Sequence, residues 1–160
     1  MAIRGSTSKD WRREVARARA RATVTDRQLR RAVVSAVQDQ GATQGAVARV
    51  LGISQPTIHR WLQDAAQQPR EGPRALGADP YEIAQRYAAG DITREQMIDA
   101  LVAWPYERDA TLDGDYWDKT YPGAPQYGTF SATVGRAYDD GLISGEEYEY
   151  LAEHAPEPPA

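Results

Sequence analysis

Residues 43–63 constrain the fold more than any other part of the sequence, because signals for two short helices and a tight turn follow one another there. Thr43 is suited to cap the first helix, and Gly52 is suited to end it. Ser54 is suited to cap the second helix, in whose first turn Pro56 is tolerated. Apolar residues recur at helical spacing in both helices: Val47, Ala48, Val50, Leu51, Ile58, Trp61 and Leu62. This segment therefore predicts a helical hairpin with one apolar face on each helix.

A further helix is predicted immediately before this hairpin. Thr25 and Gln28 have the spacing of a capping box, which favours a helix start at Thr25. Gly41 is suited to end that helix. Its apolar residues again recur at helical spacing: Leu29, Ala32, Val33, Ala36 and Val37. Residues 25–64 are therefore predicted to form a domain of three helices without a strand.

Residues 44–63 resemble the helix-turn-helix unit of bacterial repressors and resolvases. Two helices that cross steeply need a small residue where they touch, here Ala48, and a glycine in the turn, here Gly52. They also need apolar residues to fill the shared core: Val47, Leu51, Ile53, Ile58 and Trp61. The resemblance implies that the second helix enters the major groove of double-stranded DNA. It also implies a homodimer, because one recognition helix reads few bases and proteins of this class usually bind paired half-sites.

The outward face of the second helix supplies candidate DNA contacts. Gln55 can pair with adenine, and His59 or Arg60 can pair with guanine. The full set of predicted base contacts is Gln55, Pro56, His59, Arg60 and Gln63. Small polar side chains near helix N-termini usually meet phosphates, which predicts phosphate contacts by Gln44, Ser54 and Thr57.

Charge divides the chain into a basic and an acidic half. Residues 1–74 hold 14 Lys and Arg against 6 Asp and Glu, whereas residues 75–160 hold 5 against 17. A basic arm or helix is predicted over 1–24, where it adds salt-dependent affinity through phosphate contacts by Arg12, Arg13, Arg17, Arg19 and Arg21. Alternatively, this segment is a solvated helix that packs Trp11 and Val15 onto the domain.

The acidic half is predicted to be a second helical domain over 79–155, after a Pro- and Gly-containing linker at 65–78 and before a disordered tail at 156–160. Residues 87–97 recur as 138–148, with Tyr, Gly, Ile, Thr or Ser, and Glu in common. Each copy is typical of a helix that ends at glycine, an apolar plug, and a Thr or Ser cap that starts the next helix. The predicted fold is therefore mainly α: a tri-helical helix-turn-helix domain followed by two repeated hairpins.

These hairpins resemble the small helical units of some antitoxins and of short oligomerisation hairpins. A long loop is expected over 104–128, and loops of this length are often functional. Aromatic side chains rimmed by carboxylates are suited to grip a basic protein, which predicts partner contacts by Trp104, Tyr106, Trp117, Tyr121 and Tyr127. Most of the tyrosines are instead expected to build the core of the helical domain.

The patterns together predict a DNA-binding transcriptional regulator of the cytoplasm, associated with the nucleoid. The leading hypothesis is an autoregulating antitoxin, a repressor whose acidic half binds a basic toxin. The alternatives are an ordinary bacterial or mobile-element regulator that self-associates through its acidic half, and the DNA-targeting component of a recombinase or transposition system. No catalysis, cofactor, metal or membrane partner is expected, because the chain has no cysteine, only His59 and His154, and no apolar run of spanning length.

Overall fold

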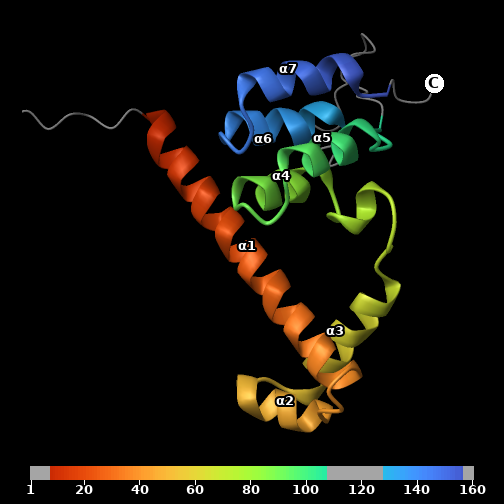
Figure 1. The fold of residues 1–160 in the computed structure, drawn as a ribbon. Coiled ribbons are helices and arrows are strands. Elements are labelled where there is room, and N and C mark those ends of the chain that lie inside the picture. Colours follow the sequence, from red (N-terminus) through yellow and green to blue (C-terminus); the bar gives the residue numbers. More distant parts are fainter. Residues whose placement is uncertain (1–7, 108–127, 157–160) are drawn as a thin grey trace, which may run out of the picture.

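The computed structural model of the protein describes residues 8–107 and 128–156. The predicted mainly α class is confirmed, since the elements over these residues are helices: α1 (Ser8–Gln38), α2 (Gln44–Leu51), α3 (Gln55–Gln67), α4 (Pro80–Ala88), α5 (Arg94–Val102), α6 (Arg136–Asp139) and α7 (Gly145–His154). A 3-10 turn at Pro73–Ala75 precedes α4, and a π-helical turn at Ser131–Gly135 leads into α6 (Figure 1). None of the described helices is long and apolar enough to cross a membrane.

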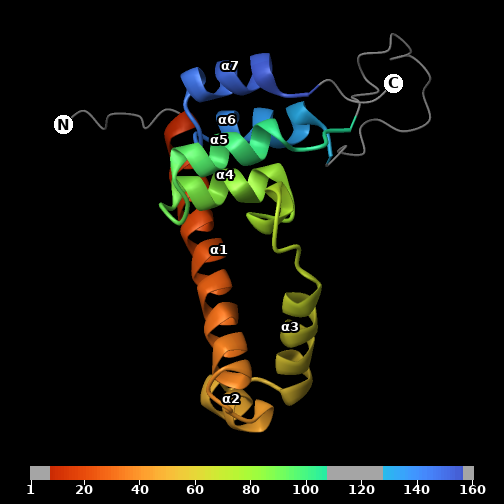
Figure 2. The ribbon, with the colours of Figure 1, turned by 45° about the vertical axis from the view of Figure 1, so that its right-hand side comes forward.

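Helix α1 is one continuous helix of 31 residues that reaches from the α4–α7 hairpins to the helix-turn-helix unit (Figure 2). The predicted helix start at Thr25 is therefore wrong. Instead of capping a new helix, the Thr25 hydroxyl donates a hydrogen bond to the Arg21 carbonyl oxygen one turn earlier, at 2.9 Å. Ala20 and Val24 are buried on either side of this turn. Packing thus carries the helix through a sequence that locally favours a start.

Helices α1, α2 and α3 share a small core, as the spacing predicted, although Leu29, Ala32 and Val50, which the spacing also assigned to the apolar faces, are exposed. Val33 of α1, Ala48 of α2 and Ile58 of α3 are its buried residues. Five partly buried side chains complete it: Val47, Leu51, Ile53, Trp61 and Leu62. Ala48 lies where α2 meets the other helices, in agreement with the requirement for a small residue at the crossing.

Two helical hairpins, α4–α5 and α6–α7, form the acidic half, which confirms the interpretation of the repeat. In each copy the chain leaves one helix through a glycine of positive φ, Gly90 or Gly141. A buried isoleucine, Ile92 or Ile143, follows in both copies. The next helix then begins at a complete capping box, Thr93 with Gln96 in α5 and Ser144 with Glu147 in α7.

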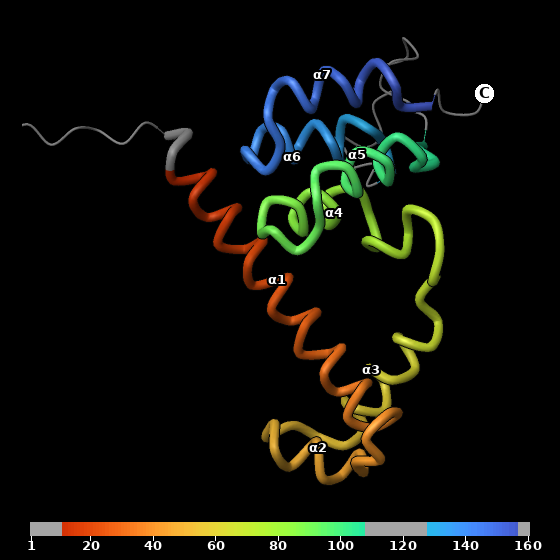
Figure 3. The backbone as a smooth tube through the Cα atoms, in the orientation of Figure 1, coloured from red at the N-terminus to blue at the C-terminus, as the bar shows by residue number. Residues whose placement is uncertain are grey.

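The core of the acidic half is closed by α1. Its buried cluster takes in Ile83, Leu101, Val134 and Leu151 from the hairpins together with Ala16 and Ala20 of α1. The end of the predicted linker joins this packing, because Leu76 is partly buried against the same cluster. Helix α1 can contact the hairpins because the chain doubles back, as Figure 3 shows. It runs along α1, turns through α2 and α3, and returns so that α4 packs against α1.

Candidate nucleic-acid interface

The turn between α2 and α3 is built by local hydrogen bonds. The Thr43 hydroxyl accepts from the Ala46 N–H at 3.2 Å and so caps α2. At the other end Gly52 has φ 67°, and the next N–H, that of Ile53, donates to the Ala48 carbonyl at 3.1 Å. Ser54 stands at the N-cap of α3, but its hydroxyl lies 2.8 Å from the Thr57 hydroxyl and makes no capping bond to the backbone. The Thr43 and Gly52 predictions are confirmed, whereas Ser54 caps by position only.

The side chains predicted to read bases share one exposed face of α3. Gln55, Pro56, His59, Arg60 and Gln63 are all exposed. Ile58 is fully buried on the other side of the helix, and Trp61 and Leu62 are half-buried beside it. Because the apolar residues hold α3 against α1 and α2, the five polar side chains are directed away from the protein. Of the predicted phosphate contacts in this unit, Ser54 is exposed, while Gln44 and Thr57 are half-buried.

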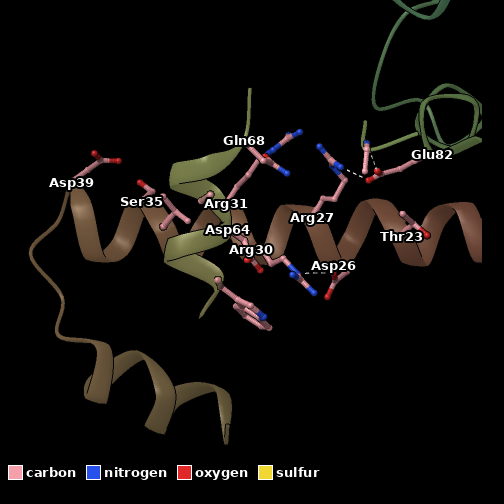
Figure 4. Close-up of a pocket in the computed structure, with 14 residues that line it drawn as sticks. Thr23, Asp26, Arg27, Arg30, Arg31, Ser35, Asp39, Asp64, Gln68 and Glu82 are labelled. Carbon is pink, nitrogen blue, oxygen red and sulfur yellow. Dashed lines mark hydrogen bonds and ion pairs between the residues drawn. The ribbon is translucent and has the colours of Figure 1, made fainter. Parts of the chain in front are cut away.

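A groove with a volume of about 560 Å³ separates α3 from α1 beside this unit (Figure 4). At the edge of the groove, Trp61 of α3 contacts Arg30 of α1. The Arg30 guanidinium lies 4.9 Å from the centre of the Trp61 ring, and this cation–π contact holds the two helices together. One wall of the groove consists of Trp61, Asp64 and Ala65 of α3 and of Gln68 at its C-cap. None of these belongs to the predicted base contacts, so the groove and the exposed polar face occupy different sides of α3.

The arginines of the first half of α1 divide into two groups. Arg12 donates from Nε to Oδ1 of Asp140 at 2.6 Å, and the side chain of Arg13 packs against the turn at Gly141. Arg17, Arg19 and Arg21 are exposed. The acidic half thus binds part of the basic helix of its own chain. The sequence had assigned the two halves to separate partners, so it did not predict this contact.

Asp140 is the centre of this contact. It is buried, and besides Arg12 it accepts a hydrogen bond from the Tyr81 hydroxyl at 2.7 Å and lies 3.6 Å from Nε of Arg136. Burial, and then the hydrogen bond to Asp140, raises the pKa of Tyr81 to about 12. Tyr81 therefore stays a neutral donor to the Asp140 carboxylate.

Two further ion pairs tie the second half of α1 to the acidic half. Arg27 pairs with Glu82 in the first turn of α4, with both side chains largely buried. Arg31 lies 4.0 Å from Asp91, which also accepts from Arg86 at 2.6 Å. The sequence contained no local signal for these pairs, because Arg27 and Glu82 are 55 residues apart.

Trp104 and Tyr106 are core residues, which corrects their prediction as partner contacts. Each is 3% exposed. The Tyr106 hydroxyl donates to the Leu101 carbonyl at 2.8 Å, and its ring meets Phe130 edge-on with centroids 5.2 Å apart. The domain is poor in large aliphatic residues, so these rings fill its interior, as expected for most of the tyrosines. The other predicted partner contacts, Trp117, Tyr121 and Tyr127, lie outside the described residues, as does most of the predicted loop.

Comparison with known proteins places the similarity in the region of this unit. The chain matches no curated protein and no solved structure. Residues 24–76, from the middle of α1 through α3 to the 3-10 turn, match the family described as a homeodomain-like domain. Both the family match and the packing of α2 against α3 indicate a helix-turn-helix unit. Together they support a helix-turn-helix DNA-binding domain in the first half of the chain.

Proposed function

We propose that the chain is a sequence-specific DNA-binding transcriptional regulator that reads the major groove through α3. One observation carries this proposal: the exposed face of α3 presents five polar or small side chains, Gln55, Pro56, His59, Arg60 and Gln63, within a segment similar to homeodomain-like domains. A recognition helix needs such a face, because the base edges of the major groove are read by hydrogen bonds and small apolar contacts.

Different side chains have different roles in this proposal. Gln55 and Arg60 make the sequence-reading contacts, since their side chains offer the paired hydrogen bonds that adenine and guanine present. Ser54, Thr57 and Gln44 contact phosphates beside the groove. Arg17, Arg19 and Arg21 add affinity that falls as salt rises and does not depend on sequence.

Binding of the full chain to a preferred site tests the role of α3. The site is first selected from random duplexes, and affinity is then measured by fluorescence anisotropy against the selected and an unrelated duplex. Arg60→Ala is expected to weaken binding to the selected site about 5- to 150-fold, which corresponds to the loss of one bidentate base contact of about 1–3 kcal/mol. Binding to the unrelated duplex should change little.

Arg70→Ala is the matched control, because Arg70 is exposed and lies just beyond the end of α3. Arg70→Ala removes the same charge as Arg60→Ala, so it should lower the affinity for both duplexes by a similar, small factor. Equal losses for Arg60→Ala on the two duplexes would make Arg60 a phosphate contact and overturn the assignment of the reading face. The absence of any preferred duplex would overturn the proposed function itself.

We infer that the finer function is regulation with self-association, because the structure counts against the antitoxin hypothesis. The antitoxin hypothesis rests on aromatic partner contacts, and the two that the structure describes, Trp104 and Tyr106, are buried. Part of the acidic charge is also neutralised within the chain by Arg12 and Arg27. A basic toxin partner and a role in recombination or transposition stay predictions without an observation in their favour. A homodimer on paired half-sites remains part of the proposal.

A further inference from the structure

The side of α1 turned away from α4 carries an uncovered apolar stripe. Trp11 and Val15 are each 58% exposed and Leu29 is 39% exposed. Ala18, Ala22 and Thr25 lie between them and are exposed as well. The six positions 11, 15, 18, 22, 25 and 29 alternate in steps of four and three, which is the spacing of a coiled-coil seam. On the opposite side of the same helix, Ala16, Ala20 and Val24 are buried in the protein.

The charges beside the stripe do not account for its apolar character. A basic helix that only contacted phosphates or solvent would have no reason to expose a tryptophan and a valine one turn apart. No described element covers the stripe, and the side of α1 away from α4 is open in Figures 1 and 3. The sequence-based alternative that Trp11 and Val15 pack onto the domain is therefore wrong for the described residues.

The order of side-chain sizes along the stripe points to its occupant. From Trp11 to Leu29 the sizes run large, medium, small, small, medium, large, with the midpoint at residue 20. A stripe with this order is complementary to itself when two copies run in opposite directions. Trp11 then meets Leu29 of the second copy, Val15 meets Thr25, and Ala18 meets Ala22. A two-fold interface requires such self-complementarity, because the same patch of both copies forms the contact.

We propose that α1 pairs with α1 of a second copy of this chain, antiparallel, through the stripe defined by Trp11, Val15, Ala18, Ala22, Thr25 and Leu29. The two alanines at the centre allow the helix backbones to approach closely, and the larger residues at both ends bury most of the apolar surface. This contact deepens the proposed function, since a two-fold dimer presents two recognition helices to paired half-sites. The pairing itself can be measured without DNA.

Electrostatics gives the dimer a recognisable salt dependence. Arg19 and Arg21 flank the centre of the stripe, where each lies beside the same arginine of the second copy, and this repulsion opposes the pairing. One helix face is smaller than the roughly 800 Å² per partner of a standard interface, which is typical of a weak, transient dimer. Added salt should tighten the dimer, whereas it weakens contacts with DNA.

Sedimentation equilibrium of the full chain tests the stripe. Val15→Asp places a charge in the seam and is expected to raise the dissociation constant of the dimer about tenfold or more. Val50→Asp is the matched control, because Val50 is an 86% exposed valine on α2, away from the stripe. It should leave the dissociation constant unchanged. A wild-type chain that stays monomeric at 200 µM would overturn the proposal, as would equal effects of the two substitutions.

Disulfide cross-linking tests the direction of the pairing, and the chain has no cysteine to interfere. In the antiparallel arrangement, Val15→Cys chains mixed with Thr25→Cys chains should form a cross-linked heterodimer under mild oxidation. Either variant alone should not cross-link, since two copies of position 15 would lie about 15 Å apart along the axis, beyond disulfide reach. Cross-linking of each variant with itself would indicate parallel helices and overturn the proposal. Both measurements stand even if no preferred DNA site is found.

Discussion

Glu147 joins the cap of the second hairpin to the first hairpin. It is 5% exposed and accepts hydrogen bonds from the Tyr87 hydroxyl at 2.7 Å, from Arg94 Nε at 3.1 Å and from the Ser144 N–H at 2.8 Å. Burial alone would raise the pKa of Glu147, but these hydrogen bonds and the charge of Arg94 outweigh burial and lower the pKa below its ordinary value. The first hairpin has Gln96 in the same position, so an amide fits this capping box.

Glu147→Gln is therefore expected to keep the cap through its one amide oxygen, and to lose both the charge and the second acceptor oxygen, which Tyr87 and Arg94 share. Because the folded state lowers the pKa of Glu147, the carboxylate stabilises the fold above pH 4.5 and loses this effect as pH falls through the folded pKa. The substitution should lower the free energy of unfolding by about 1 kcal/mol at pH 7, and the difference should shrink below pH 4.5. Urea unfolding at several pH values measures this.

The exposed neighbour Glu146 provides the control for that experiment. Glu146→Gln should change the free energy of unfolding by less than about 0.5 kcal/mol at neutral pH. A constant difference between wild type and Glu147→Gln from pH 7 to pH 3 would show that the charge of Glu147 does not matter.

At the scale of elements, the helix-turn-helix unit depends on its turn. Gly52 has φ 67°, in the left-handed region that glycine occupies without cost. Gly45, near the start of α2, is helical, and an added Cβ there would meet only Gln55 Oε1, at 3.9 Å. The backbone at position 52 therefore requires glycine, whereas the helical backbone at position 45 accepts any side chain. Substitution by alanine distinguishes the two positions.

Gly52→Ala and Gly45→Ala should shift stability in opposite directions. Gly52→Ala is expected to destabilise the fold by about 1–2 kcal/mol, because a Cβ strains left-handed backbone even where space is free. Gly45→Ala is expected to stabilise it by up to about 1 kcal/mol, because alanine loses less conformational entropy in a helix. Thermal unfolding followed by circular dichroism measures both. A rise in melting temperature for Gly52→Ala would contradict the turn geometry.

For the whole molecule, α1 is the element that joins both halves. Its first half closes the core of the hairpins, and its second half forms the helix-turn-helix core. The ion pair of Arg27 and Glu82 lies between these two contacts, and its side chains are only 15% and 17% exposed. The pair of Arg30 and Asp26 lies within α1 itself, with side chains 44% and 52% exposed. A partly buried pair between elements should contribute more than an exposed pair along one helix.

Double-mutant cycles compare the two pairs. The coupling energy between Arg27→Ala and Glu82→Ala is expected to exceed about 1 kcal/mol. The coupling between Arg30→Ala and Asp26→Ala should stay near 0.3–0.5 kcal/mol, as for exposed pairs four residues apart. Urea unfolding of the full chain and its variants measures both. Equal coupling energies would mean that Arg27 and Glu82 do not hold the halves together.

The sequence by itself determined the local features of this protein. The caps at Thr43, Thr93 and Ser144 and the stop at Gly52 could be predicted, because each depends on residues three or four positions away. The apolar face of α3 also followed from its spacing, and with it the exposed face of that helix. In α2 the spacing located Val47, Ala48 and Leu51 in the core but wrongly included Val50, which is 86% exposed.

Only the tertiary structure decided how these features are joined. Thr25 has the sequence of a helix start, yet burial of Ala20 and Val24 keeps α1 continuous there. Arg12 finds Asp140 across 128 residues, and no periodicity of either segment encodes that pairing. The sequence predicted Trp104 as a partner contact, yet its ring is buried in the core of the acidic half. Local hydrogen bonds cap the helices, but the burial of apolar surface between distant segments decides whether a local start signal is used and what each helix covers.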